Sequence, residues 1–151
     1  MKTLFATLLA GLFLANAAQA AGDDVTTVKS DAAFADVAAG IENAIVNRGF
    51  KVDYHGFIGD MLKRTASDVD ADKALYKDAE FFTFCSAVVS RKVMEADIGD
   101  IAYCPYVVFA YETADKPGEV TVGFRNLPDG GERGPVNALL SEIIEDAADG
   151  F

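Results

Sequence analysis

Two cysteines, at positions 85 and 104, are the residues whose type and spacing point most directly to chemistry in this chain. Cys85 directly precedes a predicted helix over residues 86–96, and Cys104 precedes a predicted strand that begins at Tyr106. In an oxidising compartment such a pair predicts a disulfide, which requires Cα atoms within about 7 Å of each other. The bridge would close a loop of about 20 residues, for which the chain-entropy model gives roughly 3 kcal/mol.

A reactive thiol pair is the second interpretation of the same two residues. The free N–H groups and the dipole at the start of the helix would favour a thiolate at Cys85. Ser86 and Arg91 are the candidate supporting residues, Arg91 through positive charge that folds back toward the thiol. Such a pair would exchange disulfides or carry a sulfur atom, although no Cys-x-x-Cys motif is present. Two buried, inert thiols are the third interpretation.

Soft-metal or haem binding is a further alternative. Cys85, Cys104, His55 and Met94 are the candidate ligands, and copper or haem is what such ligands would hold. Pro105 completes a Cys-Pro dipeptide similar to short haem-responsive motifs. The covalent haem motif Cys-x-x-Cys-His is absent, and a single histidine excludes a two-histidine zinc site. The leading expectation is therefore no metal and no cofactor.

Hydrolase chemistry receives little support. His55 falls on the polar phase of an alternating strand, which predicts a solvent-exposed side chain. Ser86 and Ser90 are the available nucleophiles, but neither lies in a Gly-x-Ser-x-Gly elbow. The sequence therefore leans against an enzyme without excluding one.

Composition and charge limit the classes of partner. The chain has 151 residues, 13 basic and 24 acidic, and a formal net charge of −11. This length predicts one domain, and the excess of acid argues against nucleic acid and against anionic membrane surfaces. The expected partners are a small molecule, another protein of the same compartment, or a second copy of the chain.

The first twenty residues predict a secretory signal peptide. Lys2 supplies a positive start, an apolar stretch follows, and Ala18-Gln19-Ala20 places small side chains at the cleavage site. Cleavage after Ala20 would leave a single domain over residues 21–151, without a membrane anchor. The expected location is the periplasm.

Hydrophobic periodicity predicts alternating strands and helices in the rest of the chain. The most continuous strand pattern is Tyr106 to Tyr111, and the turn residues 116–119 join it to a partner strand. Residues 66–78 are polar and predict an exposed connection. This order predicts an α+β fold with a mixed or antiparallel sheet and helices packed on one face. The expected strands cover 25–29, 50–55, 80–84, 106–111 and 120–124, and the expected helices cover 31–48, 58–65, 86–96 and a final segment from Pro135.

Two segments around the cysteines carry a family pattern. They are Phe84-Cys85-Ser86-Ala87, with Ser90-Arg91 and Glu95-Ala96-Asp97 after it, and Tyr103-Cys104-Pro105-Tyr106-Val107-Val108-Phe109-Ala110-Tyr111-Glu112. In these segments the chain resembles the domain of unknown function 302 family, over about residues 34–124. That family commonly has Asn-Pro after the first cysteine and Leu-Pro before the second. Ser86-Ala87 and Ala102-Tyr103 stand there in this chain, so the resemblance implies a divergent, exported branch.

The resemblance implies an α+β fold similar to that of the TATA-binding protein, and the ability to form a homodimer. It implies no reaction. Together with the sequence it predicts an exported binding or accessory module of unknown ligand. A thiol-based redox or sulfur-carrier protein that uses Cys85 and Cys104, or a soft-metal or haem binder through the same residues, is the alternative.

Overall fold

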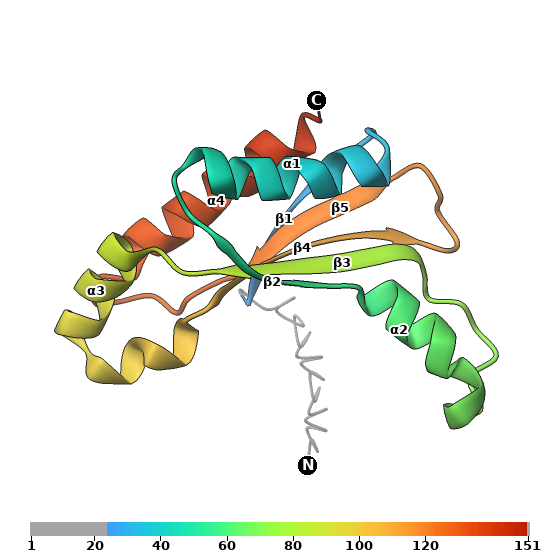
Figure 1. Ribbon diagram of the computed structural model, residues 1–151, viewed down its shortest axis with the longest axis horizontal. Coiled ribbons are helices and arrows are strands. Elements are labelled where there is room, and N and C mark those ends of the chain that lie inside the picture. The colour runs from blue at the N-terminus through green and yellow to red at the C-terminus, as the bar shows by residue number, and fades with distance from the viewer. Residues whose placement is uncertain (1–23, 151) are drawn as a thin grey trace, which may run out of the picture.

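A computed structural model describes residues 24–150, and these residues form a five-stranded antiparallel sheet with helices packed against it (Figure 1). The predicted signal peptide lies outside the described residues. In chain order the elements are β1 (Val25–Ser30), α1 (Phe34–Asn47), β2 (Val52–Gly56), α2 (Ile58–Thr65), the short 3-10 helix η1 (Ala66–Val69), β3 (Tyr76–Phe84), α3 (Ala87–Ala96), the 3-10 helix η2 (Ile98–Tyr103), β4 (Tyr106–Thr113), β5 (Val120–Arg125) and α4 (Gly134–Ala148).

The strands lie in the order β1-β5-β4-β3-β2. The hairpin of β4 and β5 occupies the centre with β3, and β4 alternates between buried and half-buried residues along its whole length. The first strand, β1, pairs with the last strand, β5, so that Val28 lies opposite Val122. This pairing places the first and the last strand of the chain side by side.

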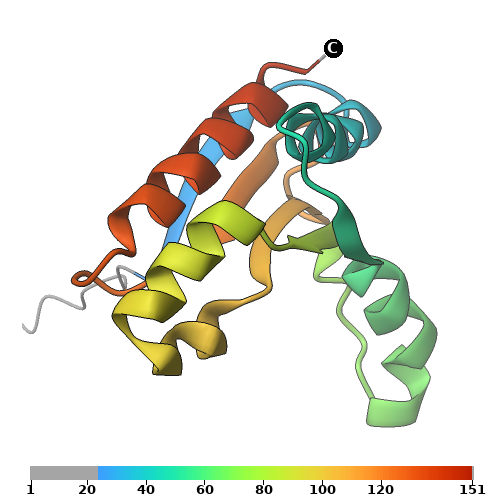
Figure 2. The ribbon, with the colours of Figure 1, turned by 60° about the vertical axis from the view of Figure 1, so that its left-hand side comes forward.

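Helices α1 and α4 cover one face of the sheet, side by side (Figures 1 and 2). Their apolar residues recur every three or four positions, which places them on one side of each helix. Gly40 of α1 permits a close approach, because a Cβ at this position would lie 3.1 Å from the Cα atom of Ala147 in α4. Fully buried residues of this core include Val37, Ile41 and Ile45 of α1, Leu140, Ile143 and Ile144 of α4, and Phe82, Phe84, Val108, Val122 and Phe124 of the sheet.

Helix α3 and η2 lie at one end of the sheet, near the start of α4 (Figure 2). The hydroxyl of Ser86 accepts the backbone N–H of Val89 and so caps α3. Asp97 closes the same helix and caps η2 by accepting the N–H of Gly99 at 2.8 Å. Two short helical segments are thus separated by a single residue.

The α+β class, the antiparallel sheet and the helices on one face confirm the predicted architecture. Strand β3 is longer than predicted, since it begins at Tyr76 within the segment predicted to be an exposed connection. That prediction is wrong over residues 76–78, because the polar residues Lys77 and Asp78 obscured the strand pattern. Within residues 24–150, no helix is both long enough and apolar enough to cross a bilayer.

Candidate functional site

The two cysteines form a disulfide, and the sheet register explains why they meet. Phe84 of β3 lies opposite Tyr106 of β4. Cys85 follows the first of these residues directly and Cys104 comes two residues before the second, so both reach the same end of the sheet. Their Cα atoms are 6.2 Å apart, and the sulfur atoms are bonded. The structure thus brings together the pair that the sequence singled out, in its oxidised form.

The residues around the disulfide hold it in place. The Ser90 hydroxyl lies 2.9 Å from the hydroxyl of Tyr106 and 3.9 Å from Sγ of Cys104. Ser86, the residue after Cys85, is buried and caps α3 through its hydroxyl. Pro105 follows Cys104 through a cis peptide bond. The Ser90 hydroxyl places Cys104 against α3, and Cys85 directly precedes the cap of the same helix, so both ends of the bridge lie beside α3.

Arg91 does not bring free positive charge to the disulfide. Its Nε atom donates to Glu95 at 2.6 Å, one turn along the exposed side of α3. The guanidinium is therefore paired with a carboxylate of its own helix, and its charge is largely offset there.

The candidate soft ligands do not form one cluster. His55 lies opposite Phe82, three residues along β3 from Cys85, which is about 10 Å in a strand. Met94 is half-buried on α3. No group of three or more His, Cys, Asp and Glu side chains within residues 24–150 is arranged to hold a metal ion.

His55 is not the exposed residue that the alternation predicted. Its Nε2 atom lies 2.7 Å from a carboxylate oxygen of Glu80, and its ring lies between those of Phe57 and Phe82 at centroid distances of 4.3 and 4.0 Å. The cause is an irregularity in the pairing of β2 with β3 between Val52 and Tyr54. This irregularity turns His55 toward the helix-covered face.

A buried ion pair anchors the segment between the cysteines to α4. Asp100 of η2, whose side chain is 3% exposed, accepts two hydrogen bonds from Arg133 at 2.6 and 3.0 Å. The guanidinium also lies 5.2 Å from the ring centroid of Tyr103. The hydrogen bond to Asp100 is the main reason that the pKa of Arg133 is raised. Sequence reasoning missed this pair because nothing in the spacing of two residues 33 apart indicates that they meet.

The sheet face opposite α1 and α4 carries a row of aromatic and small residues. Directly paired residues of an antiparallel sheet point to the same face. One such row crosses all five strands: Gly56, Phe81, Phe109, Gly123 and Thr27. The open face, as we define it, comprises Val25, Thr27, Lys29, Tyr54, Gly56, Ala79, Phe81, Thr83, Val107, Phe109, Tyr111, Thr121, Gly123 and Arg125.

No residue of the open face is an aspartate or a glutamate, although the chain contains 24 of them. Its charged residues are Lys29 and Arg125, and Lys29 is paired with Glu119 at 2.8 Å. Tyr54, at the β2 edge, is 60% exposed and lies against Phe81 at a ring distance of 5.7 Å. The open face is thus uncharged over most of its area and apolar in its centre, whereas the protein as a whole is strongly acidic.

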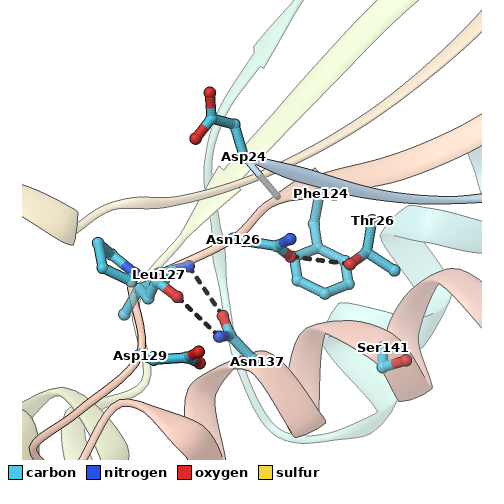
Figure 3. A pocket seen from close by; sticks show the side chains of 9 residues that line it. Asp24, Thr26, Phe124, Asn126, Leu127, Asp129, Asn137 and Ser141 are labelled. Carbon is cyan, nitrogen blue, oxygen red and sulfur yellow. Dashed lines mark hydrogen bonds between the residues drawn. The ribbon is translucent and has the colours of Figure 1, made fainter. Parts of the chain in front are cut away.

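A polar cavity of about 720 Å³ lies beside the other edge of the sheet, between β1, β5 and α4 (Figure 3). Asn137 fixes its wall by exchanging two hydrogen bonds of 2.9 Å with the backbone of Leu127. The Thr26 hydroxyl donates to Asn126 at 2.9 Å. The carboxylates of Asp24 and Asp129 also line the cavity. No sequence pattern indicated this cavity, because its residues come from three separate segments.

Comparison with known proteins supports the fold and goes no further. No protein-family model matches the chain, and no curated protein matches it. Among solved structures, the chain is similar to the uncharacterized conserved protein DUF302 from Bacillus stearothermophilus, with a TM-score of 0.57 and 14% sequence identity. The similarity covers 85% of this chain and 90% of that protein. The predicted resemblance is therefore confirmed as a DUF302-like fold.

Proposed function

We propose that this protein is an exported, non-catalytic binding module that acts as a homodimer, and that it represents a divergent exported branch of the DUF302-like fold. The observation that carries the proposal is the open face, a surface without a carboxylate on which Tyr54 is exposed and the rings of Phe81 and Phe109 are half-buried. A contiguous apolar surface of this kind marks an interaction site on a protein surface.

Charge favours a second copy as the occupant of the open face. Two molecules with a net charge of −11 repel each other. The repulsion is smallest where neither surface carries a carboxylate. Five strands about 4.8 Å apart, each of about six residues, give a face of roughly 24 by 20 Å. Two such faces bury about 1,000 Å², the lower limit for a specific interface. The expected dimer is therefore weak.

Export is supported by the first twenty residues and by the disulfide. Lys2 is followed by an apolar stretch and then by the small residues of Ala18-Gln19-Ala20. Disulfides persist mainly in oxidising compartments such as the periplasm. A binding role rather than a catalytic one is supported by the engagement of the reactive side chains: Cys85 and Cys104 are bonded to each other, and the hydroxyls of Ser86 and Ser90 are hydrogen-bonded.

Substitutions that place a carboxylate on the open face test the proposal. Val107→Glu adds a charge to the open face on the central strand β4, and Thr27→Glu adds one on the edge strand β1. The control is Val88→Glu on α3, where the side chain is 70% exposed and lies away from the sheet. We expect sedimentation equilibrium to show a dimer for the unaltered protein. The dissociation constant should rise at least about tenfold in the two open-face variants and stay unchanged in the control.

A protein that stays monomeric at up to about 1 mM would contradict the homodimer. An equal effect of Val88→Glu would show that added charge, rather than its place on the sheet, weakens the dimer. Thermal unfolding of each variant separates a lost interface from a lost fold.

A thiol-redox role is the second candidate, and the place of Cys85 favours it. The residue stands directly before the cap of α3 and is half-buried, where a thiolate would be favoured by the start of the helix. A dithiol substrate would reduce the bridge with two electrons and two protons, leaving two protein thiols and a substrate disulfide. Rapid alkylation of reduced Cys85 near neutral pH would support this role, and a rate equal to that of an unperturbed thiol would contradict it.

A further inference from the structure

The segment that joins β2 to β3 projects from the body of the protein as an arm (residues 57–75; Figures 1 and 2). It consists of α2, η1 and an extended return to Tyr76. Neither α2 nor η1 contains a buried residue. The side of α2 that faces the return segment carries Leu62 and the neighbouring Lys63, so an apolar side chain and an ammonium group lie on the same side of the arm.

A cavity of about 300 Å³ lies between α2, η1 and the return segment. This volume is at the lower end of the range for small-molecule sites. Three large apolar side chains line it and are exposed to solvent: Leu62 at 36%, Val69 at 68% and Leu75 at 54%. Single exposed apolar residues are ordinary, but several around one cavity mark a binding surface.

Two lysines give the cavity its charge. Lys63 and Lys73 line it together with a single carboxylate, Asp72. Within residues 24–150, neither lysine makes a salt bridge or a side-chain hydrogen bond, and the charge of Lys73 makes a small contribution to the lowered pKa of Asp115. On a chain with nearly twice as many acidic as basic residues, this local excess of free ammonium groups is a complementary surface for an anion.

We propose that this cavity binds a small amphiphilic carboxylate, a free medium-chain fatty acid, with its hydrocarbon against Leu62, Val69 and Leu75 and its carboxylate between Lys63 and Lys73. Binding removes these three apolar side chains from water, and the ligand carboxylate together with that of Asp72 offsets the charge of the two ammonium groups. The proposal names a ligand class for the binding module proposed above, and rests on it for a binding rather than a catalytic role.

Calorimetric titration of the mature protein with decanoate tests the proposal, with decanol and decyltrimethylammonium as probes of the same chain length. We expect saturable binding of decanoate at one site per chain. Decanol should bind about fivefold more weakly, the effect of a lost surface ion pair, and the cationic probe should bind more weakly still. Equal binding of decanoate and decanol would overturn the role of the lysines.

Variants locate the site. Lys63→Gln and Lys73→Gln should each weaken decanoate binding about threefold to fivefold. Leu75→Asp should abolish it. The matched controls are Lys92→Gln and Val88→Asp on α3, both at exposed positions. Unchanged binding in the arm variants, or no binding of decanoate below about 1 mM, would overturn the proposal.

Two further measurements distinguish this proposal from related ones. Vesicles of phosphatidylglycerol test a lipid surface as the source of the anion, and binding to vesicles without binding of free decanoate would overturn the proposal. Val107→Glu should retain decanoate binding, because the open face and the cavity are formed by different residues. Loss of the dimer and loss of ligand binding are thereby distinguishable.

Discussion

The ring of Phe109 lies over Gly123, the residue paired with it on the neighbouring strand. A Cβ atom at position 123 would stand 2.7 Å from Cζ of that ring and 2.7 Å from the backbone oxygen of Thr26. On the other side of the same row, the ring of Phe81 lies over Gly56. The rings of Phe109 and Phe81 therefore occupy the space that their paired glycines on the neighbouring strands leave free.

Gly123→Ala should destabilise the protein. The phenylalanine ring can move but the backbone of β1 cannot, so the expected loss is that of an overpacked site, about 1–3 kcal/mol. The control is Gly134→Ala at the start of α4, where a Cβ meets no atom within 4 Å. Urea denaturation measures both variants, and an equal midpoint for Gly123→Ala and the unaltered protein would contradict the proximity.

The disulfide and the signal peptide can be tested on one sample. The protein is purified from its native compartment and alkylated without reductant, and its intact mass is measured before and after reduction. We expect a chain that begins at Ala21 and takes up no label until it is reduced. Two labels without reductant would contradict a stable bridge, and a mass that includes residues 1–20 would contradict cleavage.

Loss of the bridge should lower stability by about 3 kcal/mol, since the cysteines are 19 residues apart. The double variant Cys85→Ser/Cys104→Ser, compared with the oxidised protein by urea denaturation, measures this difference. The reduced protein is the matched control, because it lacks the bond but keeps both sulfur atoms.

Ser90→Ala should lower the stability of the protein, because Tyr106 loses its hydrogen-bond partner. Burial raises the pKa of Tyr106, and Ser90 supplies the hydrogen bond at 2.9 Å. Without it the tyrosine hydroxyl is buried and unsatisfied, at a cost of about 1–3 kcal/mol. Tyr106→Phe removes the other partner. In a double-mutant cycle the combined variant should lose less stability than the sum of the two, and strict additivity would contradict a direct bond.

Glu112 should make the protein acid-sensitive. Its side chain is 3% exposed, and the backbone N–H of Gly118 and the Lys77 ammonium hold its pKa below the ordinary value of 4.5. Because the pKa is lower in the folded state, this stabilisation is complete above pH 4.5 and is lost as the pH falls through the folded value.

Glu112→Gln should therefore lower stability at pH 7, by about 1.5 kcal/mol, and flatten the dependence on pH below 4.5. Glu95→Gln on the exposed side of α3 serves as the control. Unfolding curves measured between pH 3 and pH 7 provide the comparison. If the stability of Glu112→Gln and that of the unaltered protein depend on pH in the same way, Glu112 is not the source of the acid sensitivity.

The elements with strong periodicity were predictable from sequence. Helix α2 occupies residues 58–65 as expected, and the hairpin of β4 and β5 was indicated by its branched residues and its turn. The same reasoning brought Cys85 and Cys104 to the ends of two strands. Whether those strands were neighbours depended on the sheet order, which no local pattern contains.

The features that were missed depend on register and on long-range contacts. One irregularity in β2 reverses the side to which His55 points, and alternation alone cannot detect it. The open face exists only because paired positions from five strands happen to lack carboxylates, a property of the assembled sheet. The arm cavity likewise needs the return segment to lie against α2.

The position of β1 has a consequence for how the chain folds during synthesis. This strand pairs with β5 alone, and Val25 lies opposite Arg125. During synthesis, nearly a hundred residues must be added after β1 before its partner β5 has been made. Strand pairings between such distant segments form slowly. Until β5 has been made, the sheet lacks its β1 edge and is incomplete. The sheet is thus completed late, a property that would suit the export proposed above.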